Sequence, residues 1–113
     1  MNSIRLACDI NVFTLAEREQ HIQTTRELFA TVQGIRDVEH GFEFSLPNGT
    51  DSIVKLADFI SNERRCCPFL EFTLKIPPDG HAISLTLTGP EGTQEFLREE
   101  FTLHRTSGDE AFA

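Results

Sequence analysis

The sequence predicts an α+β protein in which three helices pack on an antiparallel sheet of four to five strands. Apolar residues recur at the spacing of amphipathic helices in three segments, and they alternate with polar residues in the segments between them. Turn-forming residues divide the alternating segments into hairpins, whose strands run antiparallel. The length of 113 residues suits one domain. We therefore expect a single α+β domain over residues 1–105 and a mobile C-terminal tail over residues 106–113.

The N-terminal part predicts a short strand followed by a helix. Residues 4–11 alternate between apolar and polar side chains, as in a half-buried strand. Thr14 and Glu17 form the sequence of a capping box, in which each side chain bonds the other residue's backbone amide. We expect the helix to continue to about Gln33, because Gly34 can adopt the left-handed conformation that ends many helices. Its apolar stripe should consist of Leu15, Ile22, Leu28, Phe29 and Val32.

Two hairpins are predicted, one on each side of the second helix. Segments 35–39 and 42–46 alternate around His40-Gly41, and a two-residue turn that ends in glycine suits a tight hairpin. Segments 70–76 and 81–88 alternate around a Pro-Pro-Asp-Gly sequence, which contains the residue types that turns require. Each hairpin should place one apolar face toward the helices.

The second helix should be the best buried of the three. Its cap is expected at Thr50 or Asp51, and its end near Cys67, because the residue before Pro68 is pushed out of helical dihedrals. A third helix should begin in the Gly-Pro-Glu-Gly sequence, with Pro90 at the first helical position. The residues expected to face the core are Ile53, Val54, Leu56, Ala57, Phe59 and Ile60 in the second helix and Phe96, Leu97, Phe101 and Leu103 in the third.

These elements follow one another in the order β-α-β-β-α-β-β-α. The first six match the split βαββαβ order of ferredoxin-like domains, so we expect that arrangement with an added strand and helix. If residues 4–11 do not form a strand, the prediction becomes a four-stranded sheet with three helices.

The net charge and the cysteine content limit the possible functions. The net charge of −8 opposes binding to nucleic acids and to anionic membrane surfaces, both of which need a cationic face. The chain has no signal-peptide run and no apolar stretch of membrane length. We expect a cytoplasmic protein without nucleic-acid or membrane partners, and a homodimer is left open. In a reducing compartment the three cysteines should be thiols, so a disulfide is not expected.

The end of the second helix concentrates the chemistry of the chain. Cys66 and Cys67 are adjacent thiols that can bind a metalloid or a soft metal ion such as Zn(II), because soft ligands select soft ions. Neighbouring side chains diverge by about 100° on a helix, but Pro68 should release Cys67 from the helix. A third ligand is then needed. Cys8, on the apolar side of the first expected strand, is the best candidate.

Three charged residues precede the cysteine pair. Glu63 suits either an acid that contacts the thiols without binding the ion itself or an ordinary helix ion pair, and Arg64 and Arg65 suit either an anion site or a solvated face. The pair lies at a helix C-terminus, where the dipole disfavours thiolates; this counts against a thiol nucleophile more than against a metal site. No two histidines have a metal-binding spacing, and all four are expected at the surface: His21, His40, His81 and His104.

The cysteine run also carries a resemblance. The sequences Glu63-Arg64-Arg65-Cys66-Cys67-Pro68-Phe69 and Gly89-Pro90-Glu91-Gly92 resemble those of a family of small uncharacterised bacterial proteins with an E-R-x-C-C-P-F run and a later G-P-E-G run. Cys8-Asp9 matches an early Cys-Asp pair in that family. The resemblance spans roughly residues 6–101. It implies a shared fold and a site at the cysteines, but no established activity.

Three functions follow in order of preference. The first is a thiol protein that binds a soft metal ion or metalloid through Cys66 and Cys67, with Cys8 as third ligand. The second is a non-catalytic binding or oligomerisation module with structural cysteines, since free cysteine is among the most buried residue types. The third is a thiol-dependent enzyme.

Overall fold

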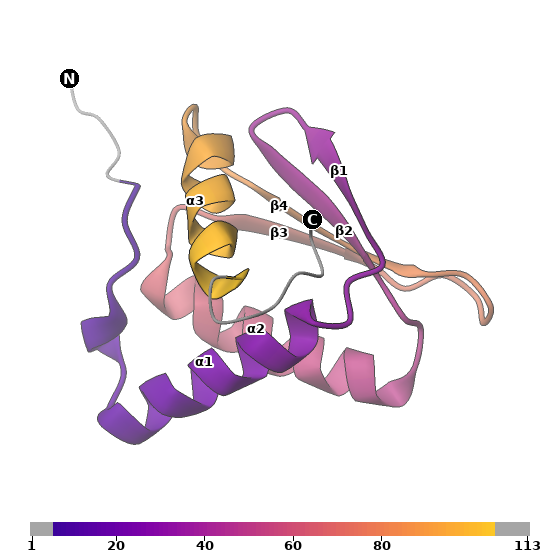
Figure 1. Ribbon diagram of the computed structural model, residues 1–113, viewed down its shortest axis with the longest axis horizontal. Helices are drawn as coiled ribbons and strands as arrows, with labels where there is room; N and C mark the ends of the chain where they lie inside the picture. Colours follow the sequence, from indigo (N-terminus) through magenta and orange to yellow (C-terminus); the bar gives the residue numbers. More distant parts are fainter. Residues whose placement is uncertain (1–5, 106–113) are drawn as a thin grey trace.

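Three helices and a four-stranded antiparallel sheet make up the protein in the computed structural model, which describes residues 6–105, with the side chains of 102–105 excepted (Figure 1). In chain order the elements are η1 (Ile10–Val12), α1 (Leu15–Phe29), β1 (Gly34–Val38), β2 (Gly41–Leu46), α2 (Thr50–Cys66), β3 (Glu71–Lys75), β4 (Ile83–Thr88) and α3 (Thr93–Arg105). The α+β class, the strand number and the helix number are confirmed. Among the described residues, no helix is long and apolar enough to cross a membrane.

The sheet has the strand order β1-β2-β4-β3, and every neighbouring pair is antiparallel. Both predicted hairpins form. His40 takes a positive φ of 61° in the first turn, and Gly41 follows it at the start of β2. Glycine is required there, because a Cβ on Gly41 would collide with the carbonyl oxygen of Leu87 on β4. The two central strands can therefore approach closely at this end.

The core lies between one face of the sheet and the helices. Alternate residues of β2 and β4 are buried, and they share one core cluster with phenylalanines from all three helices. Phe29 of α1 packs edge-on against Phe44 of β2 and Phe59 of α2, with ring centroids 5.2 and 5.3 Å apart. Phe101 of α3 lies 4.7 Å from Phe29. The core residues of the two strands are Phe42, Phe44, Leu46, Ile83, Leu85 and Leu87.

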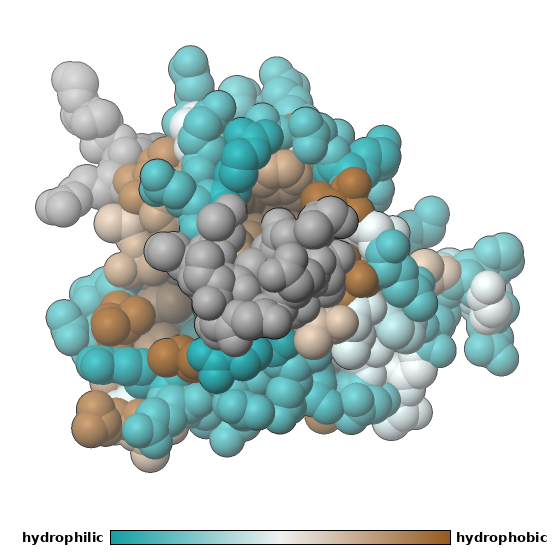
Figure 2. All heavy atoms as spheres, in the orientation of Figure 1, coloured by the Kyte–Doolittle hydropathy of each residue, from teal (hydrophilic) through white to brown (hydrophobic). Residues whose placement is uncertain are grey.

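Helix α1 turns a different face to the core than the sequence predicted. Leu15 is 67% exposed and Ile22 is also exposed, so the expected stripe is wrong at these two positions. Figure 2 shows that apolar surface on this side of the molecule lies in separate patches among hydrophilic residues. The face that packs against α2 is partly polar, and Thr24 donates a 3.0 Å hydrogen bond to Asp58 of α2. The buried residues of α1 are His21, Thr24, Thr25, Leu28 and Phe29.

Helix α2 ends at the predicted residue but begins earlier than predicted. Its N-cap is Gly49 rather than Thr50 or Asp51, and Gly49 makes no side-chain cap bond. At the other end Cys67 is the C-cap residue, with φ −122° and ψ 72°, and Pro68 follows it. The buried face of α2 also differs from the prediction, because Val54 and Ala57 are exposed. The residues that it buries are Ser52, Leu56, Phe59, Glu63 and Cys66.

The expected first strand is wrong over residues 6–11; residues 4 and 5 lie outside the described part. The segment is bonded to the end of α2 instead of to a strand: the amide of Asp9 donates to the carbonyl of Cys66 at 2.7 Å. The carboxylate of Asp9 then accepts from the amide of Asn11 and begins the 3₁₀ turn η1. The described elements therefore run α-β-β-α-β-β-α, the four-stranded form of the prediction.

Helix α3 begins three residues later than expected. Its first residue is Thr93, whose amide donates to the carbonyl of Pro90 at 3.0 Å, so Pro90 lies in the turn before the helix. Leu97 and Phe101 are buried as predicted, and Phe96 is partly buried. The side chain of Leu103 and the expected tail 106–113 lie outside the described part of the chain.

Candidate functional site

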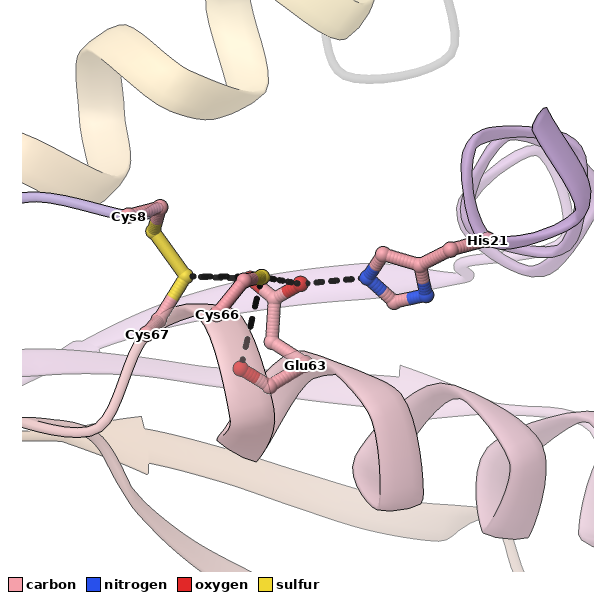
Figure 3. The surroundings of a disulfide bond; sticks show 5 residues. All are labelled: Cys8, His21, Glu63, Cys66 and Cys67. Atoms are coloured by element: carbon pink, nitrogen blue, oxygen red, sulfur yellow. Dashed lines mark hydrogen bonds and ion pairs between the residues drawn. A yellow bond between two sulfur atoms is a disulfide. The ribbon is translucent and has the colours of Figure 1, made fainter. Parts of the chain in front are cut away.

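The C-terminal end of α2 brings all three cysteines together (Figure 3). Cys66 is the last residue of the helix, and Cys67 already has non-helical dihedrals. This change of backbone direction overcomes the divergence of neighbouring helical side chains, and the two sulfur atoms lie 3.5 Å apart. Both side chains are buried, with exposed fractions of 3% for Cys66 and 0% for Cys67. The release of Cys67 before Pro68 thus has the predicted geometry.

Cys8 reaches this cluster from the segment before η1. It forms a disulfide with Cys67, across 59 positions of the sequence, and Cys66 is the free cysteine. The expectation of three thiols and no disulfide is therefore wrong for this structure. The hydrogen bond from the Asp9 amide to the Cys66 carbonyl holds the segment beside the helix end. Two bonds, one covalent, therefore fix the approach of Cys8.

Glu63 lies one helical turn before the cysteines and points at both of them. Its Oε1 is 3.8 Å from the sulfur of Cys66, and its Oε2 is 3.4 Å from that of Cys67. The thiol of Cys66 also contacts the Glu63 backbone carbonyl at 3.6 Å. The Glu63 residue is only 8% exposed. The predicted acid beside the thiols is thus in contact with both sulfurs.

His21 is a member of this site that the sequence analysis placed at the surface. That prediction is wrong: His21 is 7% exposed, and its Nε2 donates a 2.7 Å hydrogen bond to Oε1 of Glu63. Its ring lies between Phe13 and Phe59, at centroid distances of 5.4 and 5.8 Å. Helical spacing offered a signal, because Leu28 lies seven residues after His21 and therefore on the same face.

The two arginines lie away from the sulfurs. Both are exposed. Arg65 donates to the carbonyl of Val12 at 3.1 Å, approaches Glu17 at 3.6 Å, and covers the ring of Phe13. It therefore ties η1 and the start of α1 to α2. Such an arrangement supports the site from outside by holding the segment that carries Cys8.

Burial and negative charge govern the chemistry of the free thiol. Burial raises the pKa of Cys66 to about 12, and the carboxylates of Glu63 and Glu100 act in the same direction. The thiol is therefore neutral near pH 7, and an unassisted nucleophile is disfavoured. A metal ion could still bind, because coordination displaces the thiol proton.

The cluster contains donor sets that could hold a metal ion. Cys8, Cys66 and Cys67 each offer a ligand atom within 4.8 Å of the others, and so do His21, Glu63 and Cys66. A further set joins Cys8 and Glu63 with Glu100 of α3. These sets overlap at the end of α2. They define one buried centre with sulfur, carboxylate and imidazole donors.

No protein-family model, curated protein or solved structure matches this chain. The class of site is consequently defined by its own chemistry: a cluster of three cysteines, two of them joined by a disulfide, with the carboxylate of Glu63 beside them and the imidazole of His21 bonded to that carboxylate.

Proposed function

We propose that the reduced protein binds a soft metal ion or metalloid through Cys8, Cys66 and Cys67. The observation that supports this function is the convergence of three sulfur atoms from two distant segments, all within 4.8 Å of one another. Soft thiolate ligands select ions such as Zn(II), Cd(II), Hg(II) and As(III). A purely apolar role for the cysteines does not require a carboxylate to face two of them.

Binding requires that the Cys8–Cys67 bond first be reduced. A dithiol reductant supplies two electrons and two protons, becomes a disulfide itself, and leaves Cys8 and Cys67 as thiols. The ion then displaces the protons of the three thiols as the three sulfur–metal bonds form. In the disulfide form only Cys66 has a thiol. A cytoplasmic location belongs to this proposal, because a reducing compartment maintains the thiol form.

A structural module is the second candidate function. The observation in its favour is the disulfide itself, which fixes an irregular N-terminal segment to the end of α2. In that case Cys66 is simply a small buried side chain. A thiol enzyme ranks third because the raised pKa of Cys66 opposes nucleophilic attack. The similarity to the bacterial E-R-x-C-C-P-F family remains a prediction and decides between none of these.

Thiol counting combined with metal titration tests the proposal. The protein is reduced with a phosphine, which is then removed, and titrated with arsenite or Hg(II) under nitrogen. We expect one equivalent of ion to protect three thiols from a thiol reagent. The untreated disulfide form should show one thiol and no comparable binding.

Serine variants at the three cysteines separate the two main candidates. Cys8→Ser, Cys66→Ser and Cys67→Ser should each weaken arsenite binding by at least tenfold. Ser61→Ala, at an exposed position of α2, is the matched control and should bind as the wild type does. Unchanged binding in all three cysteine variants would reject metal binding and leave the structural module.

A further inference from the structure

We infer that Glu63 is a fourth ligand, so that the site takes tetrahedral divalent ions such as Zn(II) and Cd(II) in preference to metalloids that need only three thiolates. This inference rests on the proposed function and adds the class of ion. It starts from the position of Glu63, whose carboxylate contacts the sulfurs of Cys66 and Cys67 and whose ligand atom also lies within 4.8 Å of Cys8. Each of the three sulfurs therefore has a Glu63 oxygen within ligand spacing.

The distances among these atoms are close in length to the edges of a coordination tetrahedron. Zinc–sulfur bonds of ~2.3 Å and zinc–oxygen bonds of ~2.0 Å give S···S edges of about 3.8 Å and S···O edges of about 3.5 Å. The sulfurs of Cys66 and Cys67 are 3.5 Å apart, and Glu63 oxygens lie 3.8 and 3.4 Å from them. The two Glu63 distances belong to different oxygens, Oε1 and Oε2, so the carboxylate must turn to bring one oxygen to edge distance from both sulfurs.

Three edges include Cys8, and of these the edge to Cys67 must lengthen after reduction, because the disulfide joins the two sulfurs. Cys8 is on a stretch without regular secondary structure, between residue 6 and the start of η1. Its neighbour Asp9 is bonded to the Cys66 carbonyl, so the segment stays beside the helix when the disulfide opens. Cys8 can therefore retreat to ligand distance without leaving the cluster.

His21 is the positioning residue for this carboxylate. Its Nε2 donates to Oε1 of Glu63, and Oε2 is left to face the sulfur of Cys67. Ligating carboxylates are commonly held by such a second hydrogen bond, and its loss typically weakens metal binding by about 10–100-fold. The rings of Phe13 and Phe59 fix the imidazole in turn.

The burial of Glu63 also favours a cation at this place. A buried carboxylate needs partners, and protein interiors supply them as hydrogen bonds, ion pairs or metal ions. One oxygen of Glu63 has the His21 bond, whereas the other faces a sulfur atom. Glu100 is a weaker candidate for the fourth position, because it groups with Cys8 and Glu63 but in no set with Cys66 or Cys67.

A site closed by three sulfurs and one oxygen of the protein leaves no position for a reactive water, which suits storage, transfer or sensing of the ion.

The test compares a divalent ion with a metalloid in the same reduced protein. Glu63→Gln should weaken Zn(II) and Cd(II) binding by about 100-fold, while arsenite binding changes less than threefold. Glu99→Gln, at an exposed position of α3, is the matched control and should leave both affinities unchanged. Arsenite stoichiometry reports that the variant is folded, and Glu63→Asp, which keeps the charge but shortens the reach, should show the same selective loss.

The role of His21 has its own readout. His21→Phe should weaken Cd(II) binding by about tenfold or more, and His21→Gln, whose amide can still donate to Glu63, should restore most of it. The intensity of the cadmium–thiolate absorption band should stay that of three thiolates in every variant. A purely structural effect would instead weaken cadmium and arsenite together.

Each outcome decides between the two proposals. Equal loss of both ions in Glu63→Gln, or no loss of Zn(II), overturns Glu63 as a ligand while three-thiol binding stands. Selective loss in Glu100→Gln in place of Glu63→Gln reassigns the fourth ligand and overturns the inference. If reduced wild-type protein binds neither ion, the proposed function fails first.

Discussion

Reduction of the Cys8–Cys67 bond should lower the free energy of unfolding by about 4 kcal/mol. The bond closes a loop between residues 59 positions apart. The chain-entropy relation for a loop of this length gives about 14 cal/mol/K, which is about 4 kcal/mol at 25 °C. This is a large share of the ~5–15 kcal/mol that stabilises a typical domain. The redox state of one bond should therefore dominate the stability of the metal-free protein.

Urea unfolding in the presence of a chelator measures this loss. With a slope of ~2 kcal/mol per molar urea, reduction should lower the midpoint by about 2 M. Cys8→Ser without reductant should unfold close to reduced wild-type protein, because both lack the cross-link. Ser61→Ala should keep the difference between the oxidised and reduced forms.

Addition of Zn(II) should recover part of the loss, and only in the reduced protein. At a free ion concentration of 100 times Kd, the gain is about 2.7 kcal/mol. Coincident unfolding curves for the oxidised and reduced wild type, at verified thiol counts of one and three, would refute the cross-link argument. A zinc gain in the oxidised protein would contradict the requirement for reduction.

Three further predictions concern single contacts. The raised pKa of Cys66, about 12 against an ordinary 9.0, means that the fold favours the neutral thiol. The stabilisation from the neutral thiol is complete below pH ~9 and is lost toward pH 12. Between pH 8 and pH 10 the free energy of unfolding of the wild type should therefore fall by about 1.4 kcal/mol more than that of Cys66→Ala in urea unfolding, and equal losses would contradict this prediction. A double-mutant cycle of His21→Ala and Glu63→Ala in the oxidised protein should give a coupling of about 0.5–3 kcal/mol, whereas additive effects would mean that their 2.7 Å bond contributes nothing. Thr14→Ala removes one half of a capping box and should cost about 1 kcal/mol in thermal or urea unfolding, with no change in arsenite affinity.

Preferences that involve only a few neighbouring residues correctly predicted the cap of α1, the first hairpin turn and the end of α2. The capping box forms with both bonds: the Glu17 amide donates to Oγ1 of Thr14 at 3.1 Å, and the Thr14 amide donates to Oε1 of Glu17 at 3.0 Å. The hairpin turn at His40-Gly41 and the end of α2 before Pro68 also follow from backbone preferences of single residues. The adjacency of Cys66 and Cys67 marked the site for the same reason, because it is visible in the chain itself.

The face that α1 buries depended on its partner. Leu15 and Ile22 are more hydrophobic than Thr24 and Thr25, yet the threonines are buried and the aliphatic residues are exposed. Helix α2 presents Asp58 and Glu63 to α1, so hydrogen-bonding side chains are needed opposite them. Periodicity alone could not give this answer, because it ranks residues by hydrophobicity and contains no information about the surface they meet.

The sequence by itself determined the three helices, the two hairpins and the place of the cysteine pair. Only the tertiary structure decided that Cys8 would meet Cys67 and that His21 would meet Glu63, contacts that span 59 and 42 positions. The physical reason is that such contacts depend on how whole elements pack, whereas sequence patterns report the preferences of neighbouring residues. The adjacency of Cys66 and Cys67 can be read from the sequence, whereas the contacts with Cys8, Glu63 and His21 form only when the chain folds.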